Sequence, residues 1–539
     1  MKLLSSIFLS LALAMPASAG TVVIYHTSDV HGGYSVHQAK RNGEQKPIGG
    51  FAALASLIHK EKNPYLLLDS GDTFQGTPEG NFSKGAATVE LMNLLGYSAM
   101  VPGNHDFDYG IDVLKKMAKG FNFPVLSTNM YEKATKKTPS FTHPYTIRIV
   151  GGYKIAILGI VGTHTATSTL PANVKDYYFG DETKEAKKWV KKIMRKEKPD
   201  AIIILAHFGL GGPYGGKRTE VKQILPEMEQ SGTLAVARAI KGYPAVIFGG
   251  HNHSAFYTSY KDEQSGILLT ESGSHLYNAS RVELEFDDET RKLKNTSGKL
   301  IELWTEDTGS EEYVLPTIQK YKDEADAVMN QEISYTDIDL DRNFRDGGID
   351  NMAGDWFADA MRRQAKTDIG VQNSGGVRTN IAKGKITFRD VYQIMPFDNT
   401  LVVTELTGQQ VFDMVNKSIH LKGGQPTTTL QFSGIKAAWK VKEENAAANE
   451  PAKTEVIEVS LCGNTCDSEN PVFTPIDYTK TYRIATNNYL VGGGNGGDIL
   501  GQGNIKEDNQ RVLRDYLIDD LKANPVKVAP YGPRLVQVK

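Results

Sequence analysis

Five short apolar runs in the first half of the chain alternate with helix-like segments, and this alternation restricts the fold more than any other feature. Helix-like segments lie between several of the runs, for example over residues 51–62 and 112–120. The runs are rich in Val, Ile and Leu and cover residues 21–29, 64–72, 153–162, 201–209 and 245–253. A repeated order of strand and helix predicts an α/β domain whose sheet strands are buried on both faces.

The chain is too long for a single domain of this kind. It has 539 residues, more than one hydrophobic core normally serves. The pattern changes near Leu300, and residues 314–333 are expected to form an exposed connecting helix that also serves as the hinge. We therefore predict a first domain over residues 20–313 and a second α/β or α+β domain over residues 334–539.

The first nineteen residues have the character of a secretory signal peptide. Lys2 precedes an apolar run over about residues 3–15, and the small residues of ASA follow at 17–19. A membrane anchor is the alternative, but the run is shorter than the roughly 20 residues that a spanning helix needs. We expect an exported protein without a membrane anchor, located in the periplasm, with secretion beyond the envelope as the alternative.

Bulk charge excludes one class of partner. The formal net charge is −2, so no overall basic field favours a nucleic acid polymer or an anionic membrane surface. We expect a monomer that binds a small molecule.

The two cysteines, Cys462 and Cys466, predict a local disulfide in an exported protein. A metal site there would need two further soft ligands.

Polar side chains gather at the carboxyl ends of four of the five predicted strands and in one further loop. In open α/β sheets, sites form outside these strand ends, so one shared site is expected there. Some of these residues lie at the strand ends, and the others lie in the loop PGNHDFD. The full set is Asp29, His31, Asp72, Asn104, His105, Asp106, Asp108, His207, His251 and His253.

This set of side chains suits a centre of two metal ions. Imidazole nitrogens with carboxylate and amide oxygens, and no thiolate, favour Zn, Mn, Fe or Co over Ca. Two divalent cations about 3.5–4 Å apart require a carboxylate between them, and Asp72 carries the only carboxylate in its loop. Gly71 and Gly103 let the backbone turn sharply beside it. In D-x-H and H-x-H, residues two apart can point to the same side of an extended segment.

The motifs DVH, GDTFQG, GNHDFD, LAHFG and GGHNH, in this order, resemble those of the calcineurin-like metallophosphoesterases. More narrowly, the chain resembles the exported 5′-nucleotidase family, which includes bacterial UDP-sugar hydrolases and animal ecto-5′-nucleotidases. NSGGVRT (373–379), IMPFDNTL (394–401) and ATNNYLVGGGNGGD (485–498) extend the resemblance into the second half. It implies a two-domain α/β protein: a four-layered αββα sandwich followed by a mixed α/β nucleotide-binding domain.

The resemblance also implies roles for the polar residues. It implies two divalent ions, Zn, Mn or Co, that share Asp72. One ion would be held by Asp29, His31, His253 and Asp72, and the other by Asp72, Asn104, His207 and His251. His105 would not be a ligand. It would stabilise negative charge on the phosphate or assist proton transfer, and Asp108 would orient it.

Substrate contacts are implied in the second domain. Phe397 and Tyr489 would sandwich the base, with Tyr489 replacing the family's usual Phe. Arg342, Arg345 and Arg378 would bind phosphate or nucleoside, and Asn373, Asn399 and Asn495 the ribose or base. The chain departs from the family in two places. Asn495 replaces a frequent Asp, for which Asp498 could substitute, and Asp106 replaces the usual Glu.

The expected activity is hydrolysis of nucleoside 5′-monophosphates by in-line attack of a metal-activated water. Nucleoside di- and triphosphates, UDP-sugars or NAD are possible further substrates. The alternatives are 2′,3′-cyclic-nucleotide 2′-phosphodiesterase with 3′-nucleotidase activity, and pyrophosphatase action on NAD or UDP-sugars as the main activity. Thiosulfohydrolases of sulfur oxidation share the overall design, but the base-stacking residues Phe397 and Tyr489 argue against them. A non-catalytic binding protein is disfavoured because all seven implied ligands are present. The aromatic residues and the implied ligands belong to different domains, so closure about a hinge within residues 325–345 is expected.

Overall fold

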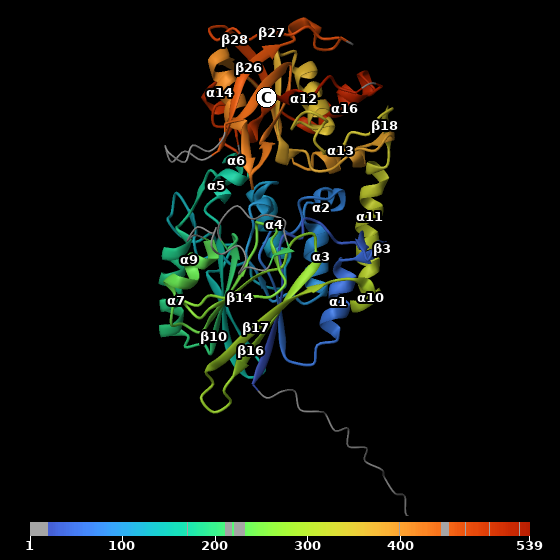
Figure 1. The fold of residues 1–539 in the computed structure, drawn as a ribbon. Helices are drawn as coiled ribbons and strands as arrows, with labels where there is room; N and C mark the ends of the chain where they lie inside the picture. The colour runs from blue at the N-terminus through green and yellow to red at the C-terminus, as the bar shows by residue number, and fades with distance from the viewer. Residues whose placement is uncertain are drawn as a thin grey trace, which may run out of the picture.

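The chain folds into two α/β bodies, one above the other in Figure 1. The computed structural model describes residues 20–169, 171–210, 218–219, 232–397, 399–442, 452–468, 470–494, 496–527 and 529–538. The predicted signal peptide (1–19) and Asn495 lie outside these residues. Within the described ranges, no helix is long and apolar enough to cross a membrane.

The first sheet of the N-terminal body contains two of the five predicted strands. Its strand order is β17-β16-β1-β4-β5. Strand β1 is parallel to β4 and antiparallel to β16, and β4 is parallel to β5. The strands are β1 (Thr21–Thr27), β4 (Tyr65–Asp69), β5 (Ala99–Met100), β16 (Asn278–Phe286) and β17 (Leu293–Glu302).

The second sheet contains the other three predicted strands. Its order is β14-β15-β12-β10-β8-β7, and β8, β10, β12 and β15 run parallel. The strands are β7 (Tyr145–Val150), β8 (Tyr153–Val161), β10 (Ala201–His207), β12 (Ala245–Gly249), β14 (Tyr260–Lys261) and β15 (Leu268–Glu271). Each predicted run is therefore a strand, shortened at its polar end.

Side-chain alternation along the strands produces four layers. Val22 and Ile24 of β1 pack inward against the second sheet, whereas Val23 and Tyr25 pack outward. Helices α1 (Phe51–His59) and α3 (Ala86–Leu94) contribute to the outward-facing core of the first sheet. The corresponding helices on the second sheet are α7 (Glu182–Lys196) and α9 (Gly232–Ala239). The predicted αββα sandwich is confirmed.

The C-terminal body is also mixed α/β, as predicted. A five-stranded sheet has the order β24-β19-β28-β21-β29 and a four-stranded sheet the order β27-β26-β25-β30. Helices α12 (Met352–Ala365), α14 (Gly408–Ser418) and α16 (Leu513–Ala523) contribute to its two cores. The strands are β19 (Ile369–Asn373), β21 (Thr400–Thr407), β24 (Leu430–Ser433), β25 (Ile435–Lys442), β26 (Lys453–Leu461), β27 (Thr474–Pro475), β28 (Thr481–Asn487), β29 (Asn504–Val512) and β30 (Leu535–Gln537).

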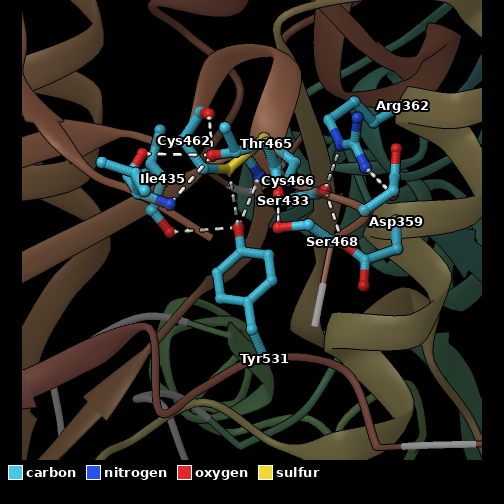
Figure 2. Close-up of a disulfide and its surroundings, with 12 residues drawn as sticks. Asp359, Arg362, Ser433, Ile435, Cys462, Thr465, Cys466, Ser468 and Tyr531 are labelled. Carbon is cyan, nitrogen blue, oxygen red and sulfur yellow. Dashed lines mark hydrogen bonds and ion pairs between the residues drawn. A yellow bond between two sulfur atoms is a disulfide. The ribbon is translucent and has the colours of Figure 1, made fainter. Parts of the chain in front are cut away.

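Cys462 and Cys466 form a disulfide within the C-terminal body, as the sequence predicts (Figure 2). The bridge closes a short turn directly after β26. Arg362 of α12 pairs with Asp467 next to this turn and donates from Nε to Ser433 Oγ at 2.8 Å. The disulfide therefore belongs to the packing of the C-terminal body, and neither cysteine lines the cavities described below.

Helix α11 (Leu315–Met329) runs along the N-terminal body towards the C-terminal one (Figure 1). It corresponds to the predicted connecting helix, but one face is buried: Ile318 and Tyr321 join the core beneath α1 and α3. Tyr321 Oη also donates to Glu90 Oε2 at 2.9 Å. By its packing, α11 belongs to the N-terminal body. The next strand, β18 (Glu332–Thr336), pairs with β20 (Gly384–Thr387) of the C-terminal body.

A small set of polar contacts holds the two bodies together. The carbonyl oxygen of Pro396 accepts from Gln75 Nε2 at 3.0 Å and from Asn81 Nδ2 at 2.8 Å. Arg389 of α13 (Phe388–Ile394) pairs with Glu79 of α2 (Pro78–Ser83) at 2.8 Å and with Asp326 of α11. The structure therefore presents the two bodies in contact across the predicted cleft.

Candidate metal centre and substrate cavity

The seven predicted ligands converge at one edge of the N-terminal sandwich. They lie at the carboxyl end of β1, β4, β10 or β12, or after β5, where the loops of both sheets meet. Five of the seven have a backbone that non-glycine residues rarely adopt, with positive φ: Asp29 (53°), His31 (48°), Asp72 (58°), His251 (73°) and His253 (55°). Such a conformation costs about 1–3 kcal/mol per residue, and it clusters at functional sites.

One group of facing ligand atoms contains Asp29, His31 and His253, whose candidate atoms lie within 4.8 Å of one another. The Nε2 atoms of His31 and His253 are 3.0 Å apart, and His253 Nε2 is 3.6 Å from Asp29 Oδ1. His31 Nδ1 lies 2.8 Å from the carbonyl oxygen of Gln75, to which it can only donate. This bond fixes the tautomer, so Nε2 of His31 offers its lone pair to the centre.

A second group surrounds Asn104 and His207. His207 Nδ1 donates to the carbonyl oxygen of Ser70 at 2.6 Å, which leaves Nε2 facing Asp72 Oδ2 at 3.2 Å. Asn104 Oδ1 lies 3.2 Å from His207 Nε2 and 2.9 Å from His251 Nδ1. Asp72 Oδ2 also lies 3.9 Å from His31 Nε2, so this carboxylate stands between the two groups. Its position matches that of a bridging ligand.

The donor set and its electrostatics fit two divalent cations. Burial, with neighbouring imidazoles, lowers the pKa of His251 to about 2 and that of His253 to about 3, so both rings are neutral and can act as ligands. Burial is also the largest cause that raises the pKa of Asp29 to about 7. A buried carboxylate of this kind is stabilised by a cation.

Glycine is required beside Asp72. A Cβ atom on Gly103 would lie 2.1 Å from Asp72 Oδ1 and 2.6 Å from His207 Cε1. Gly71 has a φ of +94°, and its Cβ would meet the backbone nitrogen of Gly103 at 2.3 Å. The sharp loops predicted from these glycines are therefore present, and no larger residue fits at either position.

His105 and Asp108 form a pair at the wall of the centre. His105 Nδ1 donates to Asp108 Oδ2 at 2.6 Å, and Thr169 Oγ1 donates to the other oxygen of Asp108 at 2.8 Å. Burial alone would lower the pKa of His105, but the Asp108 carboxylate and then Asp72 raise it to about 9. The imidazole is therefore a cation at neutral pH, and its orientation is fixed.

Asp106, the departure from the family's usual Glu, has a structural role. Its Oδ2 accepts from the backbone nitrogens of Asp72 (2.9 Å) and Gly103 (2.8 Å). Its Oδ1 accepts from the nitrogen (3.0 Å) and the hydroxyl (2.8 Å) of Thr73. The shorter side chain thus joins the two loops that carry Asp72 and Asn104.

A cavity of about 330 Å³ spans the two bodies beside this centre. His105 and Phe397 stack across it, with ring centroids 5.6 Å apart and planes at 30°. The guanidinium carbon of Arg378 lies 5.6 Å from the centroid of the same Phe397 ring. The residues lining the cavity are Asn104, His105, Asp108, His164, Ser168, Thr169, His251, Asn373, Gly375, Arg378, Phe397, Asn399, Tyr489, Gly493 and Gly494. Five of the eight predicted substrate contacts are therefore in this wall.

Two other predicted contacts, Arg342 and Arg345, lie elsewhere. Arg342 donates to the carbonyl oxygen of Arg378 at 3.1 Å and lines a neighbouring cavity of about 640 Å³ together with His31. Arg345 lines neither cavity. It binds the buried Asp355 at 2.7 Å and the carbonyl oxygens of residues 530 and 531, so its guanidinium is a structural group of the C-terminal body. Asp498, the expected substitute for Asn495, pairs with Lys417 at 2.5 Å outside both cavities.

Two further histidines, which the sequence motifs did not indicate, lie at the site. His164 follows β8 and lines the smaller cavity, and His275 lines the larger one. The His275 ring centroid is 5.5 Å from that of His31. His164 stands at the carboxyl end of a predicted strand, so the rule that selected the other residues could also have found it. His275 lies four residues beyond the end of β15, a strand that the sequence did not predict.

Comparison with known proteins agrees with this geometry. The family model for calcineurin-like phosphoesterases matches residues 22–255, and the model for the 5′-nucleotidase C-terminal domain matches residues 328–502. A 5′-nucleotidase of Vibrio cholerae is 27% identical over 95% of this chain and 92% of its own length. A trifunctional nucleotide phosphoesterase of Bacillus subtilis is 28% identical over 88% of this chain, which spans only 32% of that longer protein. The crystal structure of a 5′-nucleotidase precursor from Thermus thermophilus superposes with a TM-score of 0.76, at 26% identity, over 96% of this chain and 99% of the other.

The fold, the converging ligand loops and the two matched models define a metallophosphoesterase. Within that class, the chain belongs to the 5′-nucleotidase family, whose members join a calcineurin-like phosphoesterase domain to a 5′-nucleotidase C-terminal domain. The predicted family, its fold and its hydrolase activity are thereby confirmed.

Proposed function

We propose that the protein hydrolyses nucleoside 5′-monophosphates to nucleoside and phosphate, with the residues named above as its active site. One observation carries this proposal: a single cavity is lined by Asn104 and His251 of the metal centre and by Phe397 and Tyr489 of the C-terminal body. A phosphate and a base joined by a ribose could occupy its two ends together. The 5′-nucleotidases among its relatives support the same substrate class.

Two divalent ions, Zn, Mn or Co, complete the proposed site. Asp29, His31 and His253 would hold one ion, Asn104, His207 and His251 the other, and Asp72 both. When bound, the ions supply Lewis acidity and an activated water for in-line attack on phosphorus. Imidazole nitrogens and carboxylate oxygens converge in groups of three whose atoms lie within 4.8 Å of one another, which supports this assignment.

The chain's own groups bind and orient the substrate. The His105 imidazolium, held through Nδ1 by Asp108, would present Nε2–H to the phosphate and offset the charge that develops there. Arg378 places a second cation in the same cavity. Phe397 and Tyr489 would stack on the base, with Asn373 and Asn399 as hydrogen-bonding groups between the two ends.

Removing one ring should weaken binding of the base. We expect Phe397→Ala or Tyr489→Ala to raise KM for AMP roughly 5- to 150-fold, because stacking a base on an aromatic ring contributes about 1–3 kcal/mol. Steady-state kinetics with AMP and with ribose 5-phosphate, which has no base, measures this. Tyr489→Phe restores the family's usual residue and serves as the matched control with near wild-type KM. Equal losses for both substrates would refute the assignment.

Turnover should require separation of the two bodies. We place the hinge within residues 325–345, where α11 of one body leads into β18 of the other. Glu79 and Arg389 lie in contact across the interface, and both native cysteines are in the disulfide, so Glu79→Cys with Arg389→Cys introduces the only free thiols. A short thiol crosslinker should stop turnover of AMP in the double variant and not in either single variant. Undiminished turnover after complete crosslinking would show that the two bodies need not separate.

Cleavage of nucleotide pyrophosphates is a second candidate activity. The larger cavity meets the proposed phosphate site at His31, Arg378 and Phe397, and Arg342 and Lys322 add positive charge to its wall. Its volume of about 640 Å³ could accept the group beyond a second phosphate of UDP-glucose or NAD.

The test is product release from AMP, 3′-AMP, UDP-glucose and NAD by the purified mature protein with added Mn²⁺ or Zn²⁺. AMP cleaved fastest supports the main proposal. A mononucleotide formed from UDP-glucose or NAD, with AMP left intact, would replace it by the second. We further propose export to the periplasm by the N-terminal signal and action as a monomer. Signal cleavage in the periplasmic fraction and the mass in solution test these two points.

A further inference from the structure

A third imidazole stands beside the Asn104–His207 part of the centre. His164 is supplied by the loop after β8, directly before the short helix α5 (Thr165–Ser168). Each of His164, His207 and His251 offers a ring nitrogen, and the three nitrogens lie within 4.8 Å of one another. The group comes from the ends of three adjacent parallel strands, β8, β10 and β12.

The orientation of His164 follows from its contacts. Its ring stacks on that of His251, with centroids 3.8 Å apart and planes at 29°, and its centroid is 6.2 Å from that of His207. A Cβ atom on Gly162 would lie 2.1 Å from His164 Cε1 and 2.4 Å from its Nδ1. The ring is thus packed against a backbone position that only glycine can occupy, with its Nδ1 and Cε1 edge toward Gly162.

We propose that His164 is a further ligand of the ion held by Asp72, Asn104, His207 and His251. The inference deepens the proposed function and rests on its two-ion centre. Three imidazoles would then face one ion, whereas His31 and His253 would supply two to the other. The additional nitrogen makes the two positions chemically unequal. The additional imidazole favours Zn or Co over Mn at the position next to His164, because imidazole suits Zn and Co and oxygen ligands suit Mn.

Metal binding tests the proposal independently of activity. The mature protein, stripped by chelation, is titrated with Co²⁺ and followed by visible absorption and calorimetry. We expect two binding steps in the wild type. In His164→Ala, one step should weaken roughly 10- to 100-fold, as for disturbed metal-site shells, with a shifted absorption band. His164→Asn should recover part of the affinity through its amide oxygen. His420→Ala removes a half-buried imidazole of the C-terminal body and serves as the control.

The outcomes separate the possibilities. Equal Co²⁺ affinities and spectra in wild type and both His164 variants, with unchanged thermal melting, would overturn the inference. A raised KM for AMP with unchanged metal binding would also overturn it and make His164 a substrate contact. Fewer than two ions bound by the wild type would remove the inference and the proposed two-ion function together. One weakened Co²⁺ step in a folded His164→Ala protein, partly recovered in His164→Asn and absent from His420→Ala, supports the inference.

Discussion

Replacing Asp72 by alanine is expected to lower kcat/KM for AMP by about 10⁴-fold or more, which corresponds to about 5.5 kcal/mol of transition-state stabilisation. The Asp72 carboxylate touches both ligand groups, with Oδ2 3.2 Å from His207 Nε2 and 3.9 Å from His31 Nε2. Its Oδ1 accepts from the backbone nitrogen of His105 at 2.7 Å. One substitution would therefore remove the proposed bridge between the ions and the support of His105. Phosphate release and metal content per chain measure the effect.

Asp112→Asn is the matched control, because Asp112 is an exposed carboxylate of α4 (Ile111–Gly120) that makes only a surface pair with Lys115. This substitution should leave phosphate release and metal content per chain unchanged. An Asp72→Ala protein that retains a tenth of wild-type activity and two bound ions would contradict the bridging assignment.

The second large effect is expected at the His105–Asp108 pair. His105→Ala should lower kcat for AMP by about 10²–10⁴-fold, the usual contribution of a positioned proton donor or base. Asp108→Asn should cost less, because Asp108 acts through the ring that it orients and Thr169 still holds the amide. Neither substitution removes a proposed ligand, so two ions should remain bound. Steady-state kinetics together with metal analysis measures both expectations.

The double variant His105→Ala/Asp108→Asn provides the sharper test. If Asp108 works through His105, the double variant is no slower than His105→Ala. If the loss of kcat in the double variant equals the product of the two single losses, Asp108 acts independently of His105. Loss of bound metal in His105→Ala would show that the ring is a ligand.

Much of the fold and of the centre could be predicted because both depend on local patterns. Buried parallel strands appear as apolar runs, and their ends must meet at one edge of the sheet. Asp29, His31, Asp72, His207 and His251 could therefore be brought together from sequence. The resemblance then implied a pairing of ligands with ions, which spacing alone does not determine.

What could not be predicted depends on contacts between distant segments. Arg345 has a residue type suited to phosphate, but the structure pairs it with Asp355 and the carbonyl oxygens of residues 530 and 531, far along the chain. His275 lies beside His31 and follows β15, whose apolar run is too short to be predicted as a strand. The buried face of α11 depends on packing against α2 and α3, which its polar sequence does not reveal.

The most direct test of the proposed two-ion phosphatase is phosphate release from AMP by the purified mature protein before chelation, after chelation and after stepwise return of Mn²⁺ or Zn²⁺. We predict that activity disappears with the metal and returns fully only when two ions per chain are bound. Hydrolysis of AMP by metal-free protein, or intact AMP with two ions bound, would contradict the central claim.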